Sequence, residues 1–242
     1  MSNMGQQFPQ FYITAASPCP YLPDLMERKI FTQLTGLDAI ELHESLGRSG
    51  FRRSQAVAYR PACQNCQACV SVRVLAQEFL LSKNMRRVMQ KNSDLKRVEK
   101  PCTATQEQYM LLSQYLKSRH NDGTMANLSF AEYQEMVESS PIETQVIEYR
   151  TVLKDRLMAV SLTDILSDGI SMVYSFFDPK EQSRGLGNYL ILEHIQHTKL
   201  QNKPYVYLGY WVKNSPKMSY KARFQPIERL GPDGWFLMGK ET

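Results

Sequence analysis

The chain has 242 residues and a formal net charge of +5, with 43% hydrophobic and 22% charged residues. This balance excludes a disordered or low-complexity chain and predicts globular packing in one large domain or two small ones. No apolar run reaches the length of a membrane span, the N-terminus shows no secretion signal, and the five cysteines are odd in number and clustered. We therefore expect a cytoplasmic protein with reduced thiols and no membrane partner.

Residues 1–100 are expected to form a smaller N-terminal domain. Apolar spacing predicts two helices near its start, over Pro23–Leu34 and Leu37–Leu46. Two short strands are expected on either side of a cysteine-bearing loop, over Gln55–Tyr59 and Val70–Leu75.

The loop between these strands carries three cysteines at a spacing of three, Cys63, Cys66 and Cys69. Cys19, in the segment SPCPYLP, is the candidate for a fourth thiol ligand. Clustered thiols of this kind predict a zinc site or an iron–sulfur cluster. A set of packed free thiols is the alternative interpretation.

A basic helix is predicted over Lys83–Leu95, with Ser82 as its N-cap. Its cationic side chains are Lys83, Arg86, Arg87 and Lys91. Such a face suits the phosphates of a nucleic acid. A charge run on a helix is also typical of a plain solvated surface, so both interpretations stay open.

Residues 101–242 follow a readable order of elements. Two capping boxes predict two helices, at Thr105–Gln108 and Ser129–Glu132. Tight turns then separate three expected strands, over Gln145–Leu153, Leu157–Leu166 and Ile170–Phe177. The rest of the chain predicts a helix, a strand, a short helix and a last strand, over Leu186–Leu200, Tyr205–Gly209, Ser215–Ala222 and Phe224–Leu230.

This order of elements, α-α-β-β-β-α-β-α-β, matches the N-acetyltransferase (GNAT) fold. The segment Gln182-x-x-Gly185-x-Gly187 lies between a strand and a helix, where that fold carries a phosphate-binding loop. The sequence therefore predicts a mixed fold, α+β or α/β. A GNAT-like acyltransferase domain over residues 101–242 would follow the smaller cysteine-bearing domain.

Several blocks along the chain resemble the bacterial aspartate/glutamate leucyltransferases, which are relatives of the eukaryotic arginyl-tRNA–protein transferases. The blocks are CPYLP at 19–23, GFRRS at 50–54, the cysteine segment 59–73, the basic helix 82–94, RH at 119–120 with DG at 122–123, YSFFDP at 174–179, and residues 205–226. The departures are small. Arg184-Gly185-Leu186-Gly187 stands where we expect a Ser-Leu-Gly turn, and Leu22 lies where eukaryotic relatives tend to carry a second cysteine.

The resemblance implies an enzyme that transfers leucine from leucyl-tRNA to the N-terminal α-amine of proteins beginning with Asp or Glu. The product is then marked for degradation in the N-degron pathway. No cofactor is required for such a transfer, because the ester is already activated. The enzyme aligns the amine with the ester carbonyl, takes a proton from the ammonium and stabilises the oxyanion.

Substrate-binding candidates fall into three groups. Arg52 and Arg53 follow a glycine turn and suit an acidic side chain, since guanidinium groups bind carboxylates bidentately. His120 and Asp122 enter through the resemblance. A basic and aromatic group suits the end of the tRNA by charge and by stacking on its terminal adenosine, and comprises Tyr210, Trp211, Lys217 and Lys221. Solvated arginines and core packing of the aromatic residues are the alternatives.

Asp178 and Tyr174 are the candidates for the catalytic base. Asp178 precedes Pro179, so a turn role competes with the catalytic one. His194 and His197 lack a third ligand and are interpreted as surface residues.

Three other functions remain open from the sequence. Arginine is the alternative to leucine as the transferred group. An acetyl-CoA-dependent N-acetyltransferase would use the Gln182–Gly187 loop but would leave the N-terminal half without a purpose. A zinc-stabilised RNA-binding module without catalysis is the candidate from another class.

Overall fold

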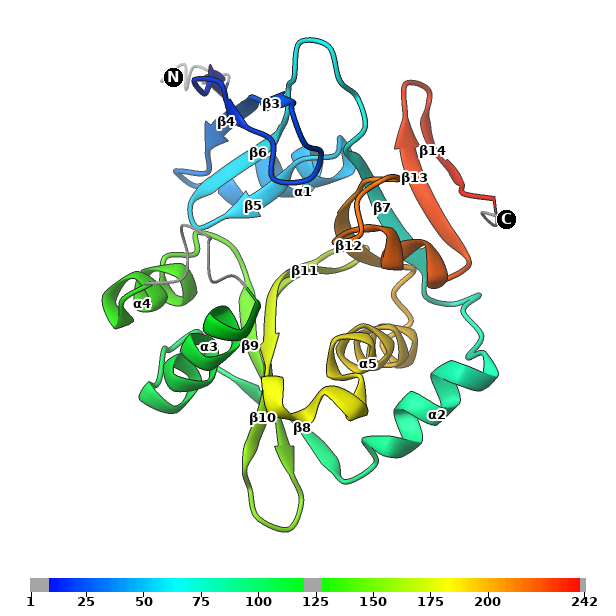
Figure 1. Ribbon diagram of the computed structural model, residues 1–242. Coiled ribbons are helices and arrows are strands. Elements are labelled where there is room, and N and C mark those ends of the chain that lie inside the picture. The colour runs from blue at the N-terminus through cyan, green and yellow to red at the C-terminus, as the bar shows by residue number, and fades with distance from the viewer. Residues whose placement is uncertain (1–8, 120–127, 240–242) are drawn as a thin grey trace, which may run out of the picture.

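The computed structural model describes residues 9–119 and 128–239, which fold around an eight-stranded mixed sheet (Figure 1). The strand order is β14-β13-β7-β12-β11-β10-β9-β8. Its strands are β7 (Val70–Leu75), β8 (Leu95–Lys100), β9 (Thr144–Thr151), β10 (Leu157–Leu166), β11 (Gly169–Phe177), β12 (Tyr205–Trp211), β13 (Ile227–Gly231) and β14 (Gly234–Leu237). All neighbours pair antiparallel except β11 and β12, which pair in parallel.

Helices cover both faces of the large sheet, as Figure 1 shows. On one face α3 (Gln106–Arg119) and α4 (Phe130–Glu138) bury Leu112 and Tyr133 against the sheet. On the other face α5 (Leu186–Leu200) buries Leu190 and Ile195, and α2 (Lys83–Lys91) packs beside α5. Burial of these apolar side chains on two faces is the main source of the fold's stability.

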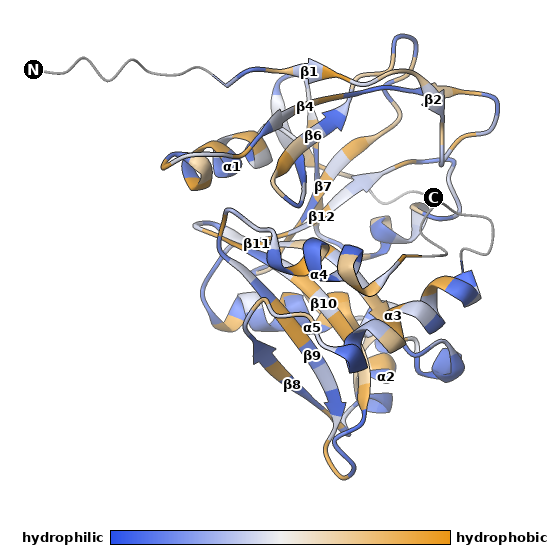
Figure 2. Cartoon of the chain, turned by 90° about the vertical axis from the view of Figure 1, so that its left-hand side faces the viewer, coloured by the Kyte–Doolittle hydropathy of each residue, from blue (hydrophilic) through white to orange (hydrophobic). Residues whose placement is uncertain are grey.

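A smaller four-stranded sheet of order β1-β4-β6-β5 lies above the large one, at the top of Figure 2. Its strands are β1 (Tyr12–Ile13), β4 (Lys29–Gln33), β5 (Arg52–Ser54) and β6 (Val57–Pro61). The helix α1 (Ala39–Arg48) closes a small core of Leu34, Ala39, Leu46 and Ala58. A separate pair, β2 (Ser17–Pro18) with β3 (Met26–Glu27), completes this region.

The elements predicted for the second half of the chain are confirmed. Reciprocal hydrogen bonds between Thr105 and Gln108, and between Ser129 and Glu132, form the two predicted capping boxes. The three predicted strands are β9, β10 and β11, and the predicted helix Leu186–Leu200 is α5. The short predicted helix is the 3₁₀ helix η2 (Ser219–Arg223), and a second one, η1 (Pro179–Arg184), follows β11.

The helix predicted over Pro23–Leu34 is wrong, because this segment forms β3 and β4 instead. Residues of β4 pair with both β1 and β6, and these non-local bonds override the local apolar spacing. The basic helix also ends earlier than predicted, at Lys91. Asn92 bonds to Val88 and to Arg184, and Leu95 begins β8.

The predicted domain boundary near residue 100 does not separate the two sheets. β7 and β8 precede that boundary, yet both are strands of the large sheet. β7 lies between β13 and β12, and β8 forms the edge beside β9. The small sheet with its helix therefore ends at β6, and the cysteine-bearing segment connects it to the large sheet. Within the described residues, no helix is long and apolar enough to cross a membrane.

Candidate active site

The two parallel strands of the large sheet separate soon after they meet. β11 and β12 share only three register pairs, from Gly169↔Tyr205 to Ser171↔Tyr207. Each strand then has an irregularity in its pairing with its other neighbour, at Leu162/Thr163 of β10 opposite β11 and at Tyr207/Gly209 of β12 opposite β7. Strands that part in this way leave backbone groups without a partner on the neighbouring strand.

Arg52 of β5 reaches the place where the strands part. Its guanidinium donates to Ser171 Oγ at 3.2 Å and to the carbonyl oxygen of Met172. It also lies across Gly209, where a Cβ atom would stand 2.8 Å from Arg52 Cζ. Gly209 has a φ of +76°, so both its backbone and the close arginine require glycine. No carboxylate of the described residues forms an ion pair with Arg52.

Arg53 has a different partner, which corrects its predicted role. It is buried and donates to both carboxylate oxygens of Asp164 on β10, from Nε at 2.8 Å and from Nη2 at 2.5 Å. Thr144 Oγ1 also donates to Asp164 at 2.9 Å. A guanidinium engaged in this way has no free face for a substrate carboxylate, so Arg53 joins the small sheet to the large one.

Lys221 lies near Arg52 and is buried, although it carries an amine. Its Nζ donates to the carbonyl oxygen of Tyr210 at 2.6 Å. Burial, together with the positive charge of Arg52, lowers the pKa of Lys221 to about 7. An amine with that pKa is partly uncharged at neutral pH and accepts a proton readily.

Tyr210 and Trp211 are core residues of β12, so neither offers a surface ring for stacking. The Tyr210 hydroxyl lies 3.0 Å and 3.1 Å from the carbonyl oxygens of Gly50 and Tyr59, which fixes the small sheet on β12. Trp211 is 4% exposed, and its indole N–H has no hydrogen-bond partner among the described residues. Lys217 is exposed in the segment that leads to η2.

The two predicted catalytic bases do not suit that role. Asp178 is buried as the N-cap of η1, where it accepts from the Lys180 N–H at 2.9 Å and pairs with Arg156. It is the turn residue of the alternative interpretation. Tyr174 packs in the core under α3, and burial raises its pKa, which keeps the hydroxyl protonated. His120 and Asp122 lie outside the described residues.

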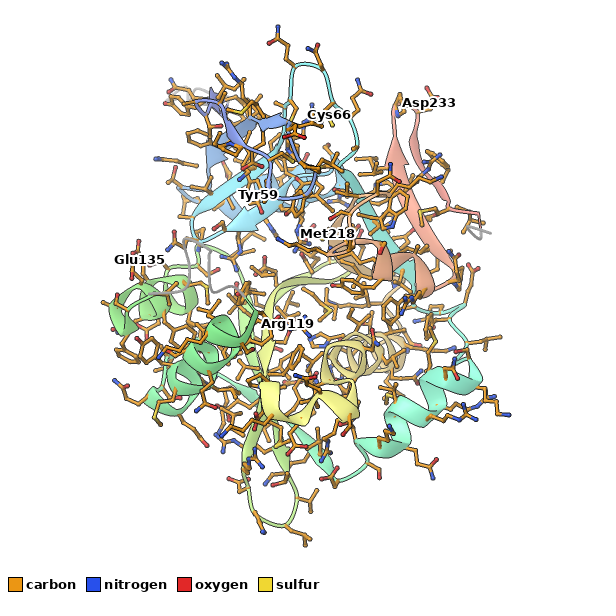
Figure 3. All side chains as sticks on the ribbon, in the orientation of Figure 1. Tyr59, Cys66, Arg119, Glu135, Met218 and Asp233 are labelled. Carbon is orange, nitrogen blue, oxygen red and sulfur yellow. The ribbon has the colours of Figure 1, made fainter. Side chains whose placement is uncertain are left out.

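The C-terminal end of α3 adds side chains to this region that sequence reasoning did not select. Arg119 stacks over the rings of Tyr115 and Phe177, at 5.6 and 5.1 Å from their centroids. The charge of Arg119 also acts on the pKa of Tyr220 in η2, which places the end of α3 near η2. Figure 3 labels Arg119, Met218 and Tyr59 on three of the segments that surround the parting strands. The block at residues 119–120 was the only sequence signal for this contribution.

The basic face predicted on α2 is present. Lys83, Arg86, Arg87 and Lys91 are exposed, whereas Met85, Val88 and Met89 pack toward the core beside α5. Ser82 accepts from the Met85 N–H as the predicted N-cap. Lys91 Nζ donates to the carbonyl oxygen of Ser183, so one of the four cations also holds the turn before α5.

The four predicted thiols share one neighbourhood around the cysteine loop, which we define as residues 62–69. Burial and the nearby Cys19, Cys63 and Cys66 raise the pKa of Cys69 to about 12. All are free cysteines and half-buried. Even so, no three His, Cys, Asp or Glu side chains in the described part of the chain are arranged to hold a metal ion. As they lie here, the thiols do not fit a metal or cluster site.

Comparison with known proteins agrees with the resemblance seen in the sequence. The family model "Arginine-tRNA-protein transferase, N terminus" matches residues 17–87, and "Arginine-tRNA-protein transferase, C terminus" matches residues 107–231. An aspartate/glutamate leucyltransferase of Nitrobacter winogradskyi is 53% identical, with 97% of this chain and 94% of that protein covered. One of Bradyrhizobium sp. strain BTAi1 is 50% identical, covering 100% and 96%.

Among solved structures, the L-PGS of Bacillus licheniformis is 12% identical with a TM-score of 0.47, covering 61% of this chain and 48% of that one. The two family models together contain Arg52, the cysteine loop, both parting strands and Lys221. With half or more of its sequence identical to curated relatives along nearly its whole length, the chain belongs to the aminoacyl-tRNA–protein transferase family that includes the aspartate/glutamate leucyltransferases.

Proposed function

We propose that this transferase moves leucine from leucyl-tRNA to the N-terminal α-amine of cytoplasmic proteins that begin with Asp or Glu, which marks those proteins for degradation. The observation that carries the proposal is the guanidinium of Arg52, which has no carboxylate partner among the described residues where β11 and β12 part. The names of the curated relatives support both leucine and the acidic acceptor.

Arg52 is suited to select the acceptor. Its bonds to Ser171 and Met172 hold the guanidinium in one place, and both partners are neutral oxygen acceptors. A half-buried cation with only neutral partners gains most from an incoming carboxylate, because a charge-assisted bidentate pair is about twice as strong as a neutral hydrogen bond. The acidic side chain of the acceptor supplies that carboxylate.

Lys221 is the described group that is suited to accept the proton of the acceptor's α-ammonium. The freed amine attacks the ester carbonyl of leucyl-tRNA, the new C–N bond forms, and the C–O bond to the terminal ribose breaks. The attacking nitrogen loses its second proton to the leaving ribose oxygen, and Lys221 releases the first proton to solvent. A carboxylate bound at Arg52 also offsets the positive charge that lowers the pKa of Lys221, so an acidic acceptor strengthens the base that it needs.

The test combines charged tRNA with short peptides that differ only in their first residue. Mass spectrometry after incubation with leucyl-tRNA should show one added leucine on peptides beginning with Asp or Glu, and little on peptides beginning with Asn or Ala. Arg52→Met should reduce transfer to the acidic peptides by ~10²-fold or more, because their carboxylate loses a desolvated partner.

Arg48→Met is the matched control, since Arg48 is an exposed arginine of α1 paired with Glu44. It should transfer leucine at the wild-type rate. The proposal fails if arginine from arginyl-tRNA or an acetyl group from acetyl-CoA is added instead, or if no peptide is modified. If Arg52→Met and the wild type prefer acidic peptides equally, Arg52 does not bind the carboxylate of the acceptor.

A further inference from the structure

The strand β12 has an irregularity beside Arg52 that the proposed reaction does not use. Its pairing with β7 shifts between Tyr207 and Gly209, and Gly209 has a φ of +76°. Residues with a side chain rarely adopt that backbone conformation. At the place where it parts from β11, the strand therefore carries a residue without a side chain.

The missing side chain leaves room for the guanidinium of Arg52. A Cβ atom at Gly209 would stand 2.8 Å from both Cζ and Nε of Arg52, and 3.2 Å from its Nη1. The guanidinium is rigid and is anchored on β11, because Nη1 donates to Ser171 and Nη2 donates to the carbonyl oxygen of Met172. A side chain at position 209 would therefore push the group off these two acceptors.

Gly50 offers a contrast with Gly209. A Cβ atom at Gly50 would stand 2.6 Å from Cδ2 of Leu230, which is the end of a flexible apolar side chain. Such a neighbour can rotate away, whereas an anchored cation cannot do so without losing its hydrogen bonds. The close contact at Gly209 is thus tied to the position of one charge.

A small cavity adjoins both residues. Its lining includes Arg52, Gly209, His43 and Ser171, and its volume is about 20 Å³. This volume holds one water-sized group, such as a single carboxylate oxygen. Among the described residues that line it there are two arginines and no Asp or Glu, so the charge favours an anion. Nε of Arg52 has no acceptor within the described part of the chain, and a carboxylate oxygen would supply one.

We propose that Gly209 is a specificity-determining residue of this transferase, an inference that rests on the proposed function. The absence of a side chain at position 209 lets Arg52 lie across β12 and keeps the cavity beside it open to the carboxylate of the acceptor. The amide of Asn has the same shape but brings no negative charge, so it gains less from this arrangement. Position 209 therefore decides whether the enzyme distinguishes Asp from Asn at the N-terminus of the acceptor.

The experiment compares Gly209→Ala with a matched glycine variant, Gly36→Ala. Gly36 has a φ of +82°, and a Cβ atom there would meet no residue within 4 Å beyond its chain neighbours, so its substitution strains the backbone without a clash. Leucine transfer is measured on two peptides that differ only in their first residue, Asp or Asn. Gly209→Ala should lower the Asp-over-Asn ratio of kcat/KM by about tenfold or more, mainly through a higher KM for the Asp peptide. Gly36→Ala should keep the wild-type ratio.

A double-variant cycle separates the clash from the backbone strain at position 209 itself. In the Arg52→Ala background, Gly209→Ala should change the ratio no further, because no guanidinium lies against the new Cβ atom. The proposal is overturned if Gly209→Ala keeps the wild-type ratio, if it slows transfer to both peptides equally, or if Gly36→Ala loses as much selectivity. Should Gly209→Ala fail to fold, Gly209→Asn replaces it in every arm, since asparagine tolerates a positive φ better than alanine does.

Binding of the two peptides without tRNA separates this inference from the proposed function. If the wild type binds the Asp peptide more tightly than the Asn peptide and Gly209→Ala removes the difference, the role of Gly209 holds even where no leucine is transferred and the proposed function fails. If the wild type transfers leucine with an acidic preference that Arg52→Met loses and Gly209→Ala keeps, the proposed function stands and the role of Gly209 is overturned.

Discussion

Adjacent arginines on β5 have opposite roles because successive side chains of a strand point to opposite faces. Arg53 turns inward and pairs with Asp164, a residue 111 positions away along the chain. Arg52 turns toward the parting strands, where no carboxylate in the described part of the chain pairs with it. The sequence predicts that both arginines bind the acceptor's carboxylate, but in the structure only Arg52 remains available for it. No local pattern reveals Asp164 as a partner, since the contact depends on how β5 lies over β10.

At the residue scale we expect the rate of leucine transfer to depend on the protonation of Lys221. Its pKa of about 7 means that the rate should rise with pH through 7 and level off above about 8, because only the uncharged amine accepts a proton. Lys221→Met should abolish this inflection and lower the single-turnover rate by ~10²–10⁴-fold. The measurement is a pH profile at short times, before the aminoacyl ester hydrolyses.

Lys221→Arg distinguishes proton transfer from a structural role. Arginine keeps a donor for the Tyr210 carbonyl oxygen but cannot lose its proton at these pH values. We expect this variant to be as slow as Lys221→Met with a similar melting temperature to the wild type. Recovery of activity in Lys221→Arg would show that the lysine acts only as a tether.

His194 shows why titratable residues are hard to place from sequence. The sequence predicts a surface position for it, yet it is fully buried under the large sheet. Its Nδ1 lies 2.7 Å from the Leu190 carbonyl oxygen and its Nε2 lies 3.0 Å from Thr163 Oγ1. Burial lowers its pKa to about 3. The deciding partner, Thr163, belongs to a distant strand, so the helix pattern of α5 alone does not identify the inward face.

At the element scale, one face of α2 packs against the core and the opposite face is exposed. Its apolar residues face the core beside α5, while Arg86 and Arg87 point outward and bond only to their own segment, at Leu81 and Asn84. No described residue supplies a carboxylate to either arginine. The exposed face is thus free to contact phosphates without loss of the helix.

Removal of these two charges should flatten the salt dependence of tRNA binding. For Arg86→Gln with Arg87→Gln, the slope of log Kd against log salt should fall by about 1–2, since each phosphate contact contributes about 0.7–0.9. Titration of tRNA at several salt concentrations measures this slope. Lys117→Gln with Lys154→Gln removes the same charge at exposed sites on other elements and should leave it unchanged. Equal slopes in both double variants would assign α2 to solvation alone.

Elements with local signals could be predicted, and elements fixed by distant partners could not. Capping boxes and tight turns define α3, α4 and the β9–β11 strands within a few residues of sequence. The segment that forms β3 and β4 has no such markers, and its pairing with β6 is decided some thirty residues later, for example at Lys29↔Pro61. The candidate site follows the same rule. The sequence identifies Arg52 and Lys221 as candidate site residues, but no local pattern predicts that they lie close together.

At the scale of the whole molecule, buried polar contacts join the small sheet to the large one. Arg53 bonds to Asp164, Arg52 to Met172, and the Tyr210 hydroxyl lies against Gly50. Glu44 of α1 also accepts from Ser167 in the β10–β11 turn. Because these contacts are distributed over several strands, the small sheet is held in a fixed position over the parting strands.

Loss of the central contact should destabilise the whole fold. Asp164 is 0% exposed, so Arg53→Met leaves an unpaired buried carboxylate, which costs about 3–5 kcal/mol. Urea unfolding measures this free energy. Arg48→Met removes an exposed ion pair with Glu44 and should cost less than about 1 kcal/mol. A similar cost for both variants would show that water or a rearranged neighbour satisfies Asp164.

The placement of Arg52 on the small sheet has a consequence for how such enzymes diversify. Under the proposed function, the charge that selects the acceptor comes from β5, whereas the amine that takes the proton comes from η2. Substitutions in one short strand can therefore change which proteins are modified while the chemistry of transfer is kept. Because selection and proton transfer reside on different elements, the set of N-terminal residues that mark a protein for degradation can change while the catalytic residues stay the same.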